Sequence, residues 1–163
     1  MLRLNLGCGN DIMPGWVNID AYNDQADVKA NIEKLPYGND TVDEILASHV
    51  IEHFHFMAGF DVLLEWKRVL KPGGKLIVET PDFLASCKDF VAADEGWRVQ
   101  LYGQFFATPW IPGQTHYFLY TETQLRGTLD QCGYKDIVRV QAESTYVKRS
   151  GAYHLFLRME AYK

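Results

Sequence analysis

The chain has 163 residues, 47% of them hydrophobic, and a formal net charge of −5 at pH 7. That length fits one domain with a sizeable core, and the hydrophobic content is ordinary for a globular chain. Net negative charge disfavours a broad phosphate-binding face, so nucleic acid is an unlikely partner.

The cysteines and the apolar runs indicate the cellular compartment expected for the chain. No apolar run is long enough to cross a bilayer and no signal peptide is recognisable, so no membrane association is expected. Cys8, Cys87 and Cys132 are odd in number, far apart and without metal-ligand spacing. A reducing, cytoplasmic setting is therefore predicted.

The N-terminal stretch predicts a strand that ends in a glycine turn. Leu2, Leu4 and Leu6 form the apolar run, and Gly7-Cys8-Gly9 follows. The glycines permit a sharp turn and the close approach of a ligand. We interpret Cys8 as a small side chain packed in this turn rather than a reactive thiol.

A second short strand, 16–19, ends in Asp20. In open α/β sheets ligands bind beyond the carboxyl ends of the strands, so the glycine turn and Asp20 are expected to face one crevice. A dinucleotide fingerprint needs a third glycine where Ile12 stands, and an acid about twenty residues on. Asp20 follows Gly9 by only eleven positions, which favours a ligand with a ribose but no pyrophosphate.

The rest of the chain predicts alternating strands and helices. Further strands are expected over 27–32, 42–49, 75–81, 136–141 and 153–162. Helices are expected over 60–70, over 83–106 with breaks near Gly96 and Gly103, and from Thr121, a capping residue, to Gly133. A turn at 70–74 and a polar link without a clear helix at 142–152 complete the pattern.

Three stretches resemble class I S-adenosylmethionine (SAM)-dependent methyltransferases, in particular the small group termed methyltransferase type 11. Residues 4–20 resemble motif I and the acidic motif that follows it. Residues 41–54 contain Val-Asp-Glu-Ile-Leu-Ala-Ser-His-Val-Ile-Glu-His-Phe, and residues 70–80 contain Leu-Lys-Pro-Gly-Gly-Lys-Leu-Ile-Val.

The resemblance implies an α/β, Rossmann-like fold over one domain, 1–163. Its seven-stranded sheet would have the order 3-2-1-4-5-7-6, with the last strand antiparallel. The family commonly has helices before the first strand and a full helix after it. This chain has one residue before the first predicted strand, and only the short stretch 10–15 lies between the first two strands. The first crossover helix is therefore expected to be truncated or missing. The cofactor would then be less covered, unless the aromatic segment or a homodimer partner covers it.

The resemblance also implies methyl transfer from SAM to a small-molecule acceptor. Gly7, Cys8 and Gly9 would contact the methionine end through their backbone, Asp20 the ribose, and Asn31 with Ile32 the adenine. The full set of expected cofactor-binding residues is Gly7, Cys8, Gly9, Asn10, Asp20, Ala21, Asn31, Ile32, Leu35, Ser48 and His49.

Two histidines are candidates for the catalytic base or for positioning the acceptor. His49 would end the fourth strand near the methyl group, and His116 lies in an aromatic-rich segment. That segment, about 83–120, is expected either to form a lid over the acceptor or to build a satellite core.

Three alternatives remain at this stage. His49-Val50-Ile51-Glu52-His53 matches the inverted zinc-protease motif, but that motif needs one continuous helix, so no metal is expected. A nicotinamide dehydrogenase is disfavoured by Ile12 and by the short spacing. A non-catalytic subunit or regulatory domain that binds SAM or S-adenosylhomocysteine (SAH) would share the same pocket.

Overall fold

The computed structural model describes residues 1–111 and 113–163, with only the backbone described for 145–147. Its centre is a seven-stranded sheet in the order β3-β2-β1-β4-β5-β7-β6. β7 runs antiparallel to both of its neighbours, and the remaining pairs are parallel. The predicted strand order and antiparallel last strand are confirmed. The strands are β1 (Arg3–Leu6), β2 (Val17–Asp20), β3 (Val28–Lys29), β4 (Val42–Ser48), β5 (Leu70–Pro81), β6 (Lys135–Val140) and β7 (Phe156–Tyr162).

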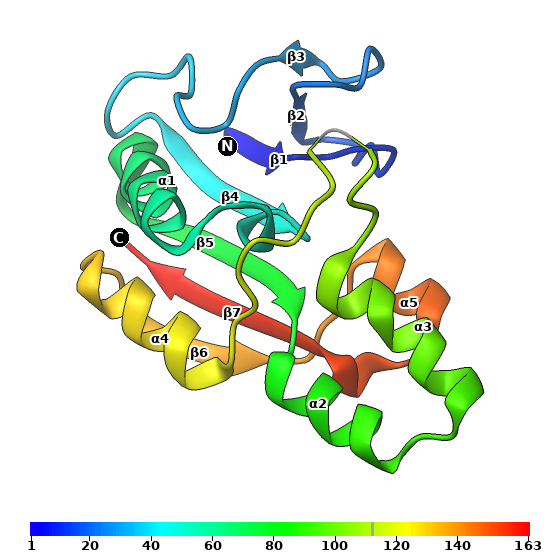
Figure 1. Ribbon diagram of the computed structural model, residues 1–163. Helices are drawn as coiled ribbons and strands as arrows, with labels where there is room; N and C mark the ends of the chain where they lie inside the picture. The colour runs from blue at the N-terminus through cyan, green and yellow to red at the C-terminus, as the bar shows by residue number, and fades with distance from the viewer. Residues whose placement is uncertain (112) are drawn as a thin grey trace.

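The helices divide into two groups (Figure 1). α1 (Phe56–Val69) and α4 (Glu122–Gln131) pack on one face of the sheet, and α2 (Phe83–Ala92), α3 (Glu95–Phe106) and α5 (Thr145–Ser150) gather beyond the end of β5. Two short 3-10 turns, η1 (Ile51–His53) and η2 (Tyr153–Leu155), precede α1 and β7. No helix among the described residues is long and apolar enough to cross a membrane.

The two faces of the sheet differ in chemistry because side chains alternate along each strand. On the face under α1 and α4, register aligns two buried apolar rows: Leu4, Ile45, Leu76 and Ala161, and then Leu6, Ala47, Val78 and Met159. On the opposite face the aligned rows are polar or charged in large part: Arg3, Glu44, Lys75 and Tyr162, and then Asn5, Leu46, Ile77 and Glu160. One face is therefore built for the core and the other for water or ligand.

The connection from β1 to β2 contains no helix, as predicted. Two buried asparagines on the polar face hold it instead. Asn5 Nδ2 donates to the Asp11 carbonyl (2.9 Å) and to Asn18 Oδ1 (3.0 Å), and the Met13 N–H donates to Asn18 Oδ1 (2.8 Å). Side-chain amides thus satisfy backbone groups of the turn that replaces the crossover helix.

Several boundaries differ from the predicted ones. β5 begins at Leu70, directly after α1, because Leu70 pairs with Val42 and a bulge absorbs the expected turn. The helical segment breaks at Ala93 rather than at Gly96, since the Asp94 side chain caps α3 by accepting from the Trp97 N–H.

Near the C-terminus the polar link forms a helix that the sequence did not predict. α5 is only six residues long and contains Lys148 and Arg149. The final strand begins at Phe156, three residues later than expected, because η2 takes up Tyr153–Leu155.

Candidate functional site

The glycine turn and Asp20 meet at the carboxyl ends of β1 and β2. Gly7 and Gly9 both have positive φ, +59° and +49°, a conformation that favours glycine. The Gly9 N–H donates to Asp20 Oδ2 (2.9 Å), and the Tyr22 and Asn23 N–H groups donate to Oδ1 (2.7 and 2.9 Å). Asp20 therefore fixes the turn and the loop that follows β2. Its Oδ1 already accepts two hydrogen bonds, whereas Oδ2 accepts one and keeps a lone pair for a further donor.

A cavity of about 1110 Å³ opens at this edge of the sheet and continues over its polar face. It is lined by ten of the eleven expected cofactor-binding residues: Gly7, Cys8, Gly9, Asn10, Asp20, Ala21, Asn31, Ile32, Ser48 and His49. Leu35 lies elsewhere. Its side chain is buried in the main core, because its N–H donates to Glu65 on α1 and draws the segment against that helix.

Two details of the cavity wall bear on the expected contacts. Asn31 Oδ1 accepts from the Glu33 N–H (2.9 Å), so the amide is partly used in a local turn, and Glu33 itself lines the cavity.

Burial raises the pKa of the Cys8 thiol to about 11, with the Asp20 charge adding to the effect. Cys8 is therefore a neutral thiol, which fits a packing role in the turn.

The two candidate catalytic histidines converge on one buried carboxylate, Glu52 of η1. Nδ1 of His49 lies 3.2 Å from Glu52 Oε1, and Nε2 of His116 lies 3.9 Å from the same oxygen. His49 follows β4 with φ +56°, and His116 comes from the loop between α3 and α4. Both histidines line the cavity.

Electrostatics favour an ionised Glu52 and a neutral His116 imidazole. Burial acts to raise the pKa of Glu52, but the neighbouring His49, His53 and His116 outweigh it and lower the pKa. Burial lowers the pKa of His116, against the opposing effect of Glu52. Oε2 of Glu52 accepts from the Thr80 hydroxyl (2.9 Å), which orients the carboxylate.

A second buried carboxylate, Glu79 on β5, was not singled out from the sequence. It accepts from the Ser48 hydroxyl (3.2 Å), the Glu143 N–H (3.0 Å) and Arg158 Nη1 (3.3 Å). Burial acts to raise its pKa, but hydrogen bonds from Ser144 and Glu143 and the charges of His49 and Arg158 lower it. The signal in the sequence was an acid inside an otherwise apolar strand.

The segment 83–120 contributes to the cavity, but not through its aromatic rings. Its lining residues are Gly103, Gln104, Ala107, Thr108, Gly113, Gln114 and His116. Trp110 is 82% exposed, and Phe106 and Tyr117 are more than half exposed. One aromatic residue of the cavity wall comes from outside the segment: Tyr22, after β2, lies so close to Gly113 that a Cβ there would meet its ring at 2.8 Å.

The His-x-x-Glu-His stretch does not form the helix that an inverted zinc-protease motif requires. β4 ends at Ser48, His49 has a left-handed backbone, and only Ile51–His53 form a single 3-10 turn. The protease interpretation is therefore excluded by the backbone.

Comparison with known proteins identifies the fold. Residues 4–78 match the family model described as methyltransferase domain. No curated protein sequence matches the chain.

Solved structures match over 99% of this chain. One is a SAM-dependent methyltransferase from Archaeoglobus fulgidus, at 16% identity, 85% coverage of that chain and a TM-score of 0.65. Another is the Burkholderia thailandensis 1,6-didemethyltoxoflavin-N1-methyltransferase with bound 1,6-didemethyltoxoflavin and S-adenosylhomocysteine, at 17% identity, 70% coverage and a TM-score of 0.62. A third comes from the Haloferax volcanii complex between the Trm112 methyltransferase activator and a methyltransferase, at 15% identity, 81% coverage and a TM-score of 0.59.

These matches agree with the strand order of the sheet. Residues 4–78 thus match a methyltransferase domain model, and the whole chain shares the fold of these SAM-dependent methyltransferases.

Proposed function

We propose that the chain transfers a methyl group from SAM to a small-molecule acceptor. The observation that carries the proposal is the hydrogen bond between the Gly9 N–H and Asp20 Oδ2, which joins the ends of β1 and β2 at the mouth of one cavity. A nucleoside without phosphates suits this geometry, because the turn supplies backbone and space but no helix N-terminus.

In this proposal the cofactor lies along the β1–β2 edge. Gly7, Cys8 and Gly9 contact the methionine end through their backbone, and Asp20 accepts from the ribose through the lone pair that remains on Oδ2. Asn31 and Ile32 lie at the adenine end, where Glu33 offers a second acceptor for the amino group.

The acceptor would occupy the part of the cavity near His49 and His116. Methyl transfer from a sulfonium is an in-line displacement with a good leaving group, so alignment and exclusion of water supply most of the catalysis. Polar side chains such as Gln104, Thr108 and Gln114 line this end, and they would hydrogen-bond a small polar acceptor.

Two further properties belong to the proposal. The described cysteines are free thiols, in keeping with a reducing, cytoplasmic setting. A second copy of the chain or a partner protein would cover the polar face left without a helix.

Titration calorimetry with SAH and, separately, with NAD tests the cofactor. Saturable binding of SAH with one site per chain, and no binding of NAD, is the expected result. Binding of NAD without SAH would refute the proposal. Turnover is then tested with methyl-labelled SAM and a panel of small polar acceptors, where firm SAH binding without any transfer would indicate a non-catalytic subunit.

A further inference from the structure

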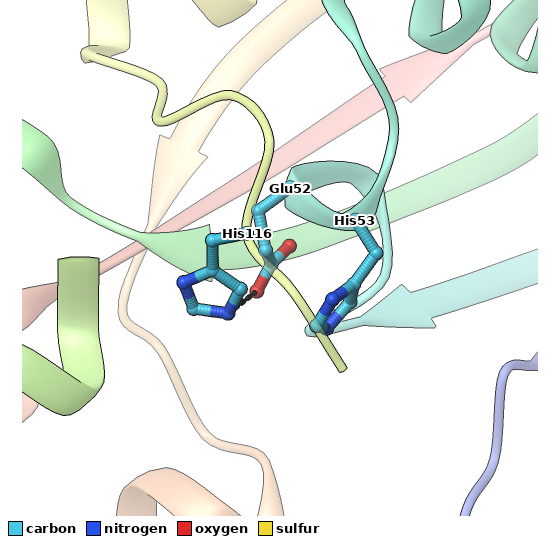
Figure 2. A group of neighbouring side chains, drawn as sticks. All are labelled: Glu52, His53 and His116. Carbon is cyan, nitrogen blue, oxygen red and sulfur yellow. Dashed lines mark ion pairs between the residues drawn. The ribbon is translucent and has the colours of Figure 1, made fainter. Parts of the chain in front are cut away.

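Three side chains that the proposed reaction does not need together converge on one point. A nitrogen of His53, a nitrogen of His116 and a carboxylate oxygen of Glu52 all lie within 4.8 Å of one another. Figure 2 shows the two imidazole rings on either side of the Glu52 carboxylate. The rings themselves are 4.9 Å apart between centroids.

Backbone carbonyls fix which nitrogen of each ring is available. Nδ1 of His53 lies 3.0 Å from the Thr115 carbonyl, and Nδ1 of His116 lies 3.0 Å from the Gln104 carbonyl. A carbonyl can only accept, so each Nδ1 carries the proton and each Nε2 presents a lone pair. An imidazole whose other nitrogen donates to a carbonyl is the usual arrangement of a metal-binding histidine.

Glu52 supplies the negative charge. Its side chain has no exposed surface, and its Oε1 lies 3.2 Å from Nδ1 of His49 and 3.9 Å from Nε2 of His116. Nε2 of His116 and Oε1 of Glu52 are thus two acceptors 3.9 Å apart, and the His53 ring lies beside them. Such a set of acceptors is stabilised by a cation between them.

The scaffold around the cluster is already assembled. The Tyr117 N–H donates to the Glu52 carbonyl (2.8 Å), which ties the segment carrying His116 to η1. Thr80 on β5 holds the other carboxylate oxygen. Donors 2.0–2.2 Å from a tetrahedral ion lie about 3.4 Å apart, so small side-chain rotations would complete the coordination.

We propose that Glu52, His53 and His116 bind one divalent transition-metal ion, with Zn²⁺ the best match to two imidazoles and a carboxylate. His53 and His116 line the cavity, so the fourth position of the ion faces it and is open to an oxygen or nitrogen atom of a bound molecule. The site differs from a zinc-protease site, because only two of its ligands come from the His-x-x-Glu-His stretch and the third comes from the α3–α4 loop.

The test uses the full chain without an affinity tag, stripped with a chelator. Co²⁺ is added and the visible d–d absorption recorded, and Zn²⁺ is then titrated in competition. The expected result is one ion per chain, visible Co²⁺ bands that Zn²⁺ abolishes, and a rise in Tm with either ion.

His53→Gln and His116→Gln are each expected to weaken Zn²⁺ binding at least tenfold and to remove the rise in Tm. His154→Gln is the matched control, since His154 pairs with Asp89 on the exposed surface, and it should bind as the parent does. If His116→Gln does not fold, His53→Gln decides the question, because it removes the other imidazole of the same site.

Two results would overturn the proposal. One is a bound-metal content of the parent below roughly a tenth of an ion per chain. The other is an unchanged Zn²⁺ affinity in both His53→Gln and His116→Gln, which would show that the ion binds elsewhere on the chain. SAH titration of the metal-free parent is run in parallel. Loss of SAH binding alone would count against the proposed function, and loss of metal binding alone would count against this site.

Discussion

Removing the Asp20 carboxylate is expected to weaken SAH binding by about 2–4 kcal/mol. Hydrogen bonds to a charged acceptor contribute about 1.5–3 kcal/mol each, and a ribose offers two hydroxyls. We expect less than the full sum because three backbone N–H groups already share the charge of this carboxylate. At 1.4 kcal/mol per tenfold change, Asp20→Ala should weaken binding roughly 30- to 700-fold.

The same substitution removes the acceptor of those three N–H groups, so loss of affinity could reflect a disordered turn. Asp27 provides the matched control. Its carboxylate accepts from the Asn18 N–H and from Asn18 Nδ2 (both 2.8 Å) and does not line the cavity. Asp27→Ala should therefore lower Tm without changing SAH affinity. Asp20→Asn, which keeps one oxygen, should retain more stability than Asp20→Ala while still weakening SAH.

Calorimetric titration of the variants, with circular dichroism to verify folding, makes the comparison. SAH affinity of folded Asp20→Ala within roughly twofold of the parent would refute the ribose contact. Equal losses of affinity in the Asp20 and Asp27 variants would also refute it, because they would trace the effect to the loop alone.

Three other predictions follow from local geometry. Gly7→Ala should destabilise the chain by about 2–4 kcal/mol in urea unfolding, because the added Cβ would lie 2.7 Å from Val50 and φ is +59°. Gly9→Ala places its Cβ in open space and should destabilise the chain by only about 1–2 kcal/mol. Equal losses of stability in the two variants would contradict the packing argument. Hydrogen bonding by Arg68 is the main cause that lowers the pKa of Glu65. The ionised carboxylate therefore stabilises the folded chain above the pKa of Glu65 in the unfolded state, and this stabilisation is lost as the pH falls through its lower pKa in the folded state. Glu65→Gln should flatten the decline of Tm at acid pH, and an unchanged decline would contradict the role of this ion pair. Cys87, the less buried thiol, should be alkylated by iodoacetamide at pH 8 well before Cys8 and Cys132, whose pKa values burial raises to about 11; peptide mass spectrometry reads the order, and early labelling of Cys8 would contradict it.

The sheet could be predicted from the sequence because its signals are local. Alternation in β1 and β7, the proline and glycines after α1, and the capping pair Thr121 and Gln124 each fix an element by itself. The strand order then followed from the family resemblance. The boundary of β5 was wrong because a bulge between Val42 and Glu44 depends on the register between strands, which no local pattern reports.

The cavity could be predicted where Gly7, Gly9 and Asp20 line it, and only partly near His49 and His116. Gly7, Gly9 and Asp20 lie at the ends of adjacent strands, so topology alone brings them together. Leu35 was expected among the cofactor-binding residues, but its N–H donates to Glu65 on α1 and its side chain is buried in the core. The junction of Glu52 and His116 was missed because the fold, not the spacing, brings the α3–α4 loop against η1.

The polar face of the sheet explains why the truncated crossover is tolerated. A helix packed there would require an apolar partner surface, yet the strands present Arg3, Asn5 and Lys75. Lys75 pairs with Glu160 across the strands (2.8 Å), and Asn5 holds the loop that replaces the helix. The charged rows and the missing helix are thus two parts of one arrangement, because a face that buries no helix has no need of apolar side chains. The cavity extends over this same face. A molecule bound there therefore contacts charged side chains, where a full crossover helix would instead have packed against apolar ones.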